Sequence, residues 1–207
     1  MSIKSYSDIN EMHIDVLREI ANIGSGNAAS SLSRMLNHSV NISIPHIGIL
    51  GFNEAYEVLG GPEAIMMGTL LMLTGGVNGM MMFLLPVEVV CDLVNMLMST
   101  EIKSHEEIDE MGYSVINEVS NIMSASFVTA IADMTELVID ISPPEAALDM
   151  LGSIMSVPSI YFAKMSDTLL LIQNELEIEG KKTSASVLML PDMESLEKLM
   201  TSLGIDI

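Results

Sequence analysis

A pattern of residues occurs twice in this chain, at a constant separation of 99 residues, and this repeat constrains the fold more than any other feature. The four marked positions and their counterparts are Asp15 and Ser114, Glu19 and Glu118, Asn22 and Asn121, and Pro45 and Pro144. The windows 14–45 and 113–144 align without a gap, and nine of their residue pairs are identical. Because neither burial nor helix formation demands this polar set, the repeat predicts a duplicated site as well as a duplicated scaffold.

Length and composition predict a single domain over residues 1–207, built from two intimately joined halves. We expect the two repeats to cover about residues 8–99 and 104–207, joined at 99–103. Hydrophobic residues make up 49% of the chain, which is ample for a core. The 28 acidic and 8 basic residues give a net charge of −20, which excludes binding to the phosphate backbone of nucleic acids. A basic protein surface is the expected partner.

Several other classes of site are disfavoured by the sequence. Cys91 is the only cysteine and lies in an apolar helical pattern, so we expect it to pack in the core. The four histidines are scattered and have no zinc-ligand spacing, so no intrinsic metal site is expected. The uncharged segment 64–87 imitates a membrane span, but the turn residues 74–79 in its middle favour a buried hairpin. With no signal peptide pattern, we expect a soluble, cytoplasmic monomer without membrane insertion.

The order of predicted elements is also repeated. Capping-box patterns at 8–11 and 104–107 predict long helices over about 10–36 and 106–134. Apolar runs predict strands at 40–44, 46–50, 65–73 and 77–85, and then at 137–141, 159–163, 168–178 and 184–190. Pro86 and Pro191 introduce closing helices over 87–98 and 192–203, and residues 146–151 predict a short extra helix. The fold class is α/β (α+β), with pseudo-two-fold helix–strands–helix units whose long helices pack on a shared, mainly antiparallel sheet.

The repeated polar residues share one face of each long helix. With Glu19 at zero, Asp15, Asn22 and Gly26 lie at about −40°, −60° and −20°, nearly opposite the apolar stripe. Small residues surround each asparagine, namely Gly26, Ser30 and Ser33 in the first copy and Ala125, Thr129 and Ala132 in the second. Since asparagine is a poor helix former, and since a merely solvated face would carry Lys and Glu, we interpret this face as open to close approach by another surface.

An asparagine amide does not titrate in the useful range, so it cannot act as a general base, but it can hold a water molecule in position. Phosphoryl transfer is the chemistry in which alignment of the reactants contributes most. The adjacent glutamate offers a charge that could anchor a partner's lysine or arginine. The pattern lacks a Ser/His set, and Gly24 and Gly26 do not follow a strand as a dinucleotide-binding loop would.

The two copies of Asp/Ser-x-x-x-Glu-x-x-Asn, each followed by a proline, resemble the signature of the CheC/CheX/FliY phosphatases of bacterial chemotaxis. The run 18–29 is the most specific stretch, and the two-motif layout and length look most like the CheC branch. The resemblance implies hydrolysis of the aspartyl phosphate of the response regulator CheY. It implies that Asn22 and Asn121 orient the attacking water, and that Glu19 and Glu118 engage the active-site lysine of the receiver.

The same resemblance implies that Mg²⁺ is supplied by CheY, and that the receptor deamidase CheD is a further partner. We assign partner contacts to Asp15, Gly26, Ser114 and Ala125 beside the motifs, and the CheD contact to the segment around Asp149. The alternative function is an adaptor that binds CheD or flagellar components with weak or vestigial hydrolysis. The intact Glu and Asn pairs favour the phosphatase, because a pure scaffold needs neither asparagine. The 20 methionines mostly lie in core patterns and do not by themselves indicate an adaptable interface.

Overall fold

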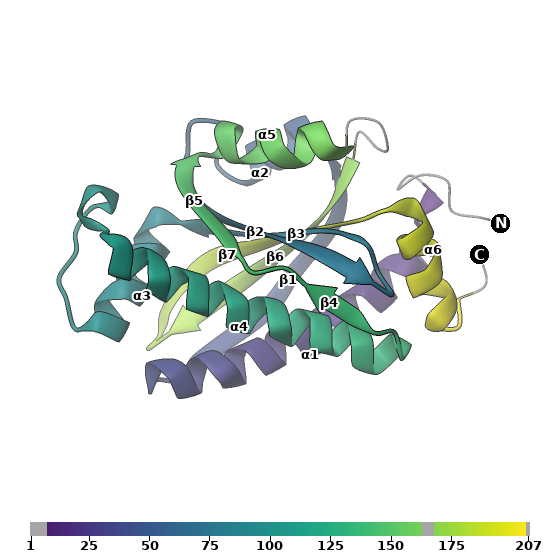
Figure 1. Cartoon of the computed structure of the whole chain (residues 1–207), viewed down its shortest axis with the longest axis horizontal. Helices are drawn as coiled ribbons and strands as arrows, with labels where there is room; N and C mark the ends of the chain where they lie inside the picture. Colours follow the sequence, from purple (N-terminus) through teal and green to yellow (C-terminus); the bar gives the residue numbers. More distant parts are fainter. Residues whose placement is uncertain (1–7, 163–167, 206–207) are drawn as a thin grey trace.

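The computed structural model describes residues 8–162 and 168–205 and confirms the mixed helix and sheet fold (Figure 1). The first half contains α1 (Glu11–Leu36), β1 (Val40–Gly51), α2 (Phe52–Val58), β2 (Ile65–Gly75), β3 (Gly79–Pro86) and α3 (Val87–Met98). The second half follows a 3₁₀ helix, η2 (His105–Glu107), and contains α4 (Glu110–Thr135), β4 (Ile139–Ile141), β5 (Glu145–Met150), α5 (Leu151–Phe162), β6 (Thr168–Ile178), β7 (Lys181–Pro191) and α6 (Met193–Ser202).

The separation of 99 residues found in the sequence extends through the first elements of each half. Moving α1 forward by 99 positions gives the bounds of α4. The same shift carries β1 onto the stretch 139–150, which begins with β4 and ends with β5. The second half therefore contains the same strand as the first, but interrupted at 142–144.

The strands form one seven-stranded antiparallel sheet in the order β1-β6-β7-β3-β2-β4, with β5 also paired to β2. The two hairpins, β2–β3 and β6–β7, meet at the centre, where Met82 is opposite Leu188. The first hairpin, formed by the apolar segment 64–87, was predicted from the turn residues in its middle. The chain thus places one hairpin from each half on either side of the pseudo-two-fold axis.

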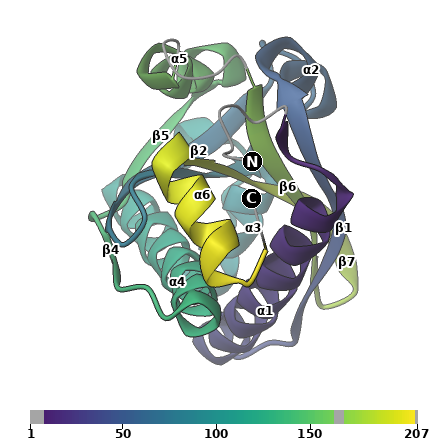
Figure 2. The same ribbon diagram turned by 90° about the vertical axis from the view of Figure 1, so that its right-hand side faces the viewer.

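The helices cover both faces of the sheet (Figures 1 and 2). The long helices α1 and α4 lie side by side against one face, while α2 and α5 lie over the other. The shorter α3 and α6 lie toward opposite ends of the molecule. α4 is long and apolar enough to cross a membrane, but more than half of its apolar segment is buried inside the protein.

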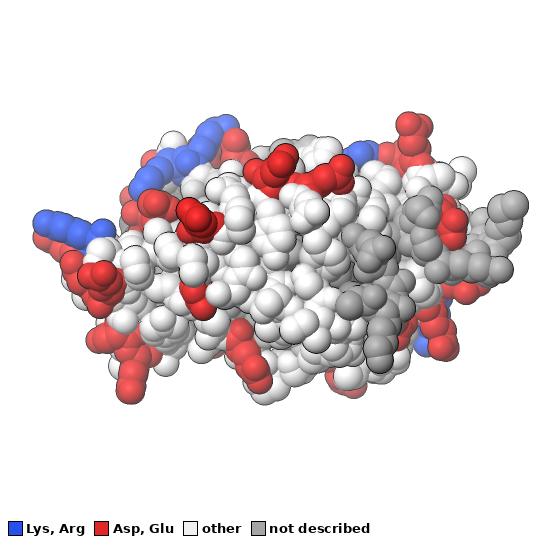
Figure 3. Space-filling view, turned by 90° about the horizontal axis from the view of Figure 1, so that it is seen from above, with Lys and Arg blue, Asp and Glu red and all other residues white. Residues whose placement is uncertain are grey.

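The face that carries α2 and α5 shows the acidic character of the chain (Figure 3). Asp and Glu side chains are spread over it, Lys and Arg are visible at few places, and a broad area without charge lies in the middle.

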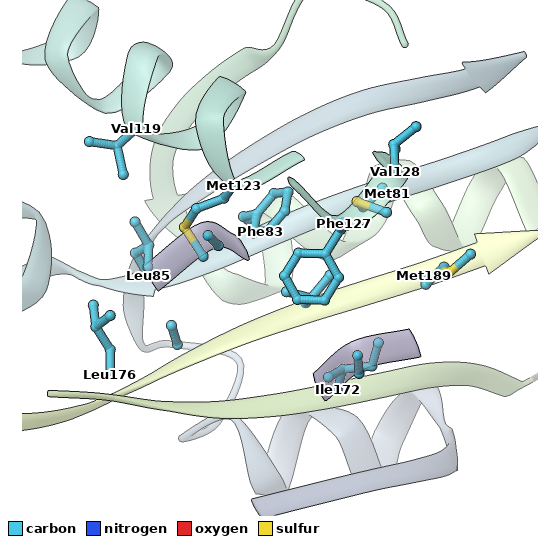
Figure 4. Close-up of a cluster of buried hydrophobic side chains, with 14 of the residues drawn as sticks. Met81, Phe83, Leu85, Val119, Met123, Phe127, Val128, Ile172, Leu176 and Met189 are labelled. Atoms are coloured by element: carbon cyan, nitrogen blue, oxygen red, sulfur yellow. The ribbon is translucent and has the colours of Figure 1, made fainter. Parts of the chain in front are cut away.

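The main core fills the space between the two long helices and the sheet (Figure 4). Phe127 of α4 meets Phe83 of β3 edge to face, with ring centroids 6.1 Å apart. Sheet methionines such as Met81 and Met189 pack in the same core, as their sequence pattern predicted. Cys91 is also buried in it, and burial together with the nearby acidic side chains raises the pKa of its thiol. The thiol is consequently a packing group and a poor nucleophile.

The start of α4 differs from the prediction. α1 begins after Asn10, whose side chain accepts a hydrogen bond from the backbone N–H of His13 at 3.2 Å. α4 begins at Glu110 and not at 106, because Asp109 is its cap and accepts from the backbone N–H of Gly112 at 2.9 Å. The earlier pattern at 104–107 forms η2 instead.

Three strand and helix predictions are wrong in the segments that follow the long helices. Residues 146–150, predicted as a helix, form β5, because pairing with β2 satisfies their backbone groups. Residues 159–162, predicted as a strand, belong to α5, and Ala163 lies outside the described residues. The predicted strands at 40–44 and 46–50 are one strand, β1, with a register shift between Ser43 and His46. The helix α2 was not predicted at all.

We predict that Phe127→Ala lowers the free energy of unfolding by about 3–5 kcal/mol, since it leaves a cavity at the contact between α4, α1 and the sheet. Urea unfolding followed by circular dichroism measures this loss. Thr129→Ala, at an exposed position on the same helix, is the control and should change stability by less than about 0.5 kcal/mol. Similar losses in the two variants would contradict the assigned role of Phe127.

Candidate active site

The repeated polar residues lie on the outer faces of α1 and α4. Glu19 and Asn22 are exposed on α1, and Glu118 and Asn121 are exposed on α4. Asp15 and Ser114, one turn before each glutamate, are exposed as well. Helical periodicity therefore predicted the outward orientation of all six side chains correctly.

Packing of the opposite faces fixes this orientation. Leu17, Ile20 and Ala21 of α1 are buried against the core, as are Ile116 and Val119 of α4. The helices approach closely where Gly24 faces Phe127, since a Cβ added to Gly24 would lie 3.0–3.1 Å from atoms of that residue.

Buried hydroxyl groups also connect the helices to the sheet. Ser25 donates a hydrogen bond to Oδ1 of Asn174 at 3.1 Å, and Ser120 donates to Thr69 at 3.0 Å. Each helix therefore cannot rotate about its axis without breaking core packing and a buried hydrogen bond.

In the second half, the polar residues border an open groove of about 540 Å³. The groove lies between α4 and the link that joins β4 to β5. Its lining residues are Ser114, Asn117, Glu118, Asn121, Ile141, Ser142, Pro143 and Pro144. The structure thus brings Pro144, the last residue of the repeated pattern, to the same surface as Glu118 and Asn121.

The proline marks a break in the strand beside the helix. Ser142 holds the broken end against β2, because its N–H donates to the carbonyl of Met72 and its Oγ accepts from the N–H of Met72, both at 3.0 Å. Proline has no N–H to continue the ladder. In the first half, the pairing of β1 with β6 shifts register between Ser43 and His46, at the matching place.

The first site differs in its surroundings. Asp15 forms an ion pair with Arg18, whereas the matching residues on α4 are Ser114 and Asn117. A groove of about 420 Å³ runs between the start of α1 and β1, and its lining includes Asp15 and Arg18 but neither Glu19 nor Asn22. The side chains of Ile44 and Pro45 lie outside the described part of the structure.

The predicted partner-contact residues fall into two groups. Gly26 and Ala125 are exposed beside the asparagines, and a Cβ added to Gly26 would meet no atom within 4 Å. Asp149 is exposed on β5, not on a helix as predicted, and its carboxylate accepts from the N–H of Met150 at 2.7 Å. It borders a different groove, formed with α5, which contains none of the repeated polar residues.

Sequence reasoning missed Asn117. This side chain borders the groove of the second half, and its Oδ1 is buried without a hydrogen-bond partner. It was overlooked because it lies about 100° from Glu118 around the helix. The available signal was its spacing of one turn from Asn121, which places two amides on neighbouring positions of one helix face.

These side chains can bind and orient another molecule, but none of them is an activated nucleophile. Glu118 contributes a charge, and the Asn121 amide contributes two donors and an acceptor. Among residues 8–162 and 168–205, no group of three or more His, Cys, Asp or Glu side chains could hold a metal ion.

Comparison with known proteins identifies the family of this chain. The CheC-like family model matches residues 12–49 and 111–147, which contain both copies of the Glu and Asn pair. The CheY-P phosphatase CheC of Bacillus subtilis (strain 168) is 30% identical over 203 residues, covering 96% of this chain and 97% of that protein. This chain belongs to the CheC-like family.

Two further comparisons give a similar sequence and a similar fold. The flagellar motor switch phosphatase FliY of Bacillus subtilis is 25% identical over 147 residues, covering 70% of this chain and 38% of that longer protein. The crystal structure of Thermotoga maritima FliY has the same fold, with a TM-score of 0.77 and 22% identity over 95% of this chain and 98% of that one. The CheC-like fold predicted from the repeat is confirmed.

We predict that Ser142→Ala lowers the free energy of unfolding by about 1–2 kcal/mol, because the N–H of Met72 loses its acceptor at the strand break. Urea unfolding provides the measurement. The exposed Ser184 of β7 supplies a matched control, and Ser184→Ala should have almost no effect. An unchanged stability for Ser142→Ala would mean that this hydroxyl does not hold the edge of the groove.

Proposed function

We propose that this CheC-like protein is a phosphatase that hydrolyses the aspartyl phosphate of the response regulator CheY. The relative named CheY-P phosphatase CheC, matched over nearly the full length of both chains, supports this proposal. The observation that carries it is the exposure of a glutamate and an asparagine, one turn apart, on each of two helices. In the second half this pair borders an open groove that another protein can enter.

In the proposed reaction, water attacks the phosphorus atom of the phosphoaspartate. The new P–O bond forms as the bond to the aspartate oxygen breaks, the carboxylate leaves with the electron pair, and the water proton passes to the phosphate. Asn22 or Asn121 hydrogen-bonds the water and holds it in line with the breaking bond. Such positioning is effective because alignment and charge placement contribute most of the catalysis in phosphoryl transfer.

The glutamates have a separate role in this proposal. Glu19 and Glu118 form an ion pair with a lysine of the receiver, which fixes the partner over the asparagine. The receiver also provides Mg²⁺, which neutralises charge on the phosphate. The net charge of −20 on this chain favours encounter with a basic surface around that lysine.

We predict that the variant Asn22→Ala/Asn121→Ala accelerates the decay of phosphorylated CheY about 100-fold less than the unsubstituted protein, because no amide then positions the water. Loss of radiolabelled acyl phosphate provides the measurement. Each single variant should retain activity through the other half. Asn27→Ala, at an exposed asparagine on α1, is the matched control and should leave the rate unchanged.

Equal acceleration by the folded double variant would overturn the role of the two asparagines. No acceleration by the unsubstituted protein would overturn the phosphatase itself.

A second proposed function is adaptor binding through the face made by β5 and α5. Val157 and Ile160 of α5 are exposed, and Val157 lines a groove of about 250 Å³ together with Asp149, Ser153 and Ile154. This face lies across the sheet from α1 and α4 (Figure 1). We assign it to CheD, which could then bind while the phosphatase sites stay open.

We predict that Val157→Ser/Ile160→Ser weakens CheD binding about 10-fold. The two apolar side chains that CheD would bury are then absent, and their favourable burial is lost. Calorimetric titration with CheD provides the measurement. Hydrolysis of phosphorylated CheY by this variant should be unchanged. Unaltered CheD binding would show that CheD does not use this face, and slower hydrolysis would show that the two surfaces are not independent.

A further inference from the structure

The two long helices share one more feature beyond their glutamates and asparagines. Each begins with the same dipeptide, Glu11-Met12 in α1 and Glu110-Met111 in α4, again separated by 99 residues. The dipeptide directly follows the capping residue in both helices. The repeat therefore extends further toward the start of each helix than the polar pattern alone.

The methionine side chains are exposed, which is unusual for this chain. Met12 is 63% exposed and Met111 is 60% exposed. Among the other methionines in the described ranges, only Met150 is exposed, at 45%, and the rest are buried or half-buried. Two of the three exposed methionines thus occupy equivalent positions in the two halves.

Helix formation explains the glutamate but not the methionine. A carboxylate in the first turn is favoured by the helix dipole, so Glu11 and Glu110 need no further reason. Methionine is a good helix former, but polar residues such as glutamine serve the helix equally well, so helix formation does not require a large apolar side chain in water at the next position. Scattered single apolar residues are common on protein surfaces, but recurrence at one position of a repeat is a different observation.

The methionines lie on the same helix face as the proposed sites. Met12 is seven residues before Glu19, which places it about 20° around the helix and about 10 Å along its axis. Met111 has the same relation to Glu118. A standard protein interface covers about 800 Å² on each partner, a patch roughly 16 Å in radius, so a protein docked over the glutamate also covers the methionine.

We propose that Met12 and Met111 are apolar docking residues for the receiver domain, each serving the site on its own helix. This inference rests on the proposed phosphatase function and names a part of its binding surface. The partner contact is an apolar side chain framed by lysine or arginine, because Met12 follows Glu11 and lies about one turn from Asp15, and Met111 follows Glu110. The flexible thioether side chain suits such a contact, since it adapts to the shape of the opposing surface.

The test places each methionine substitution in a protein with one working site. Asn121→Ala leaves only the first site, and Asn22→Ala leaves only the second. Met12→Gln in the Asn121→Ala background should raise KM for phosphorylated CheY about 5- to 10-fold and leave kcat unchanged, as expected for lost burial of a methionine. Met12→Gln in the Asn22→Ala background should change neither constant. Met111→Gln should show the reverse dependence.

Glutamine matches methionine in length and helix propensity, so helix α1 or α4 should form normally. Met150→Gln, at the third exposed methionine, is the control and should leave KM unchanged in both backgrounds. An unchanged KM for Met12→Gln and Met111→Gln would overturn the proposal. So would a rise that is the same in both backgrounds, or one that Met150→Gln reproduces.

A binding measurement distinguishes the failure of this proposal from the failure of the proposed phosphatase function. If the unsubstituted protein fails to accelerate hydrolysis, titration with CheY carrying beryllofluoride as a stable phosphate mimic still measures docking. Weaker binding of the Met12→Gln/Met111→Gln variant would then support the docking surface while the phosphatase proposal fails. Equal binding of that variant and the unsubstituted protein would overturn the docking surface.

Discussion

The contact between α1 and α4 is the constraint on which the rest of this molecule depends. Gly24 lies against Phe127 where the helices approach, and Phe127 continues into the sheet through its contact with Phe83. One side of each helix is consequently committed to the core, which leaves the other side free of packing requirements. The exposed Glu and Asn residues occupy that free side, so the same packing that stabilises the fold also determines the direction in which the sites face.

The break in the outer strand forms the side of the site that faces the helix. A continuous strand would pair all of its backbone groups with its neighbour, and it would leave no irregular backbone beside the helix. Proline cannot donate to the ladder, and in the second half Ser142 secures the broken end through two hydrogen bonds to Met72. The matching shift of register in β1 shows that both halves use this device. The proline of the repeated pattern therefore lies at an irregularity of the outer strand, although it belongs to the motif of a helix.

Features set by repeated spacing could be predicted from the sequence, and features set by tertiary pairing could not. The outward direction of Asn22 and Asn121 follows from helical periodicity alone. Residues 146–151 have strong local helix propensity, but pairing with β2 holds 145–150 as a strand, which overrides that preference. The repeat itself indicated a strand at 145–150, since the matching segment of the first half is the end of β1. The helical spacing of Asn117 from Asn121 was available in the sequence, but the burial of its Oδ1 beside a groove became visible only in the structure.

The two sites share a scaffold but differ next to the glutamate. In the first half, Arg18 and Asp15 form an exposed ion pair, which contributes little to stability because water screens it. In the second half, the matching Asn117 is uncharged, and its Oδ1 is buried beside the groove without a hydrogen-bond partner in the protein. The amide of Asn117 can accept a hydrogen bond from a bound molecule, whereas the guanidinium of Arg18 can only donate. The halves thus present the same Glu and Asn beside different side chains, so duplication has kept the pair and changed its surroundings.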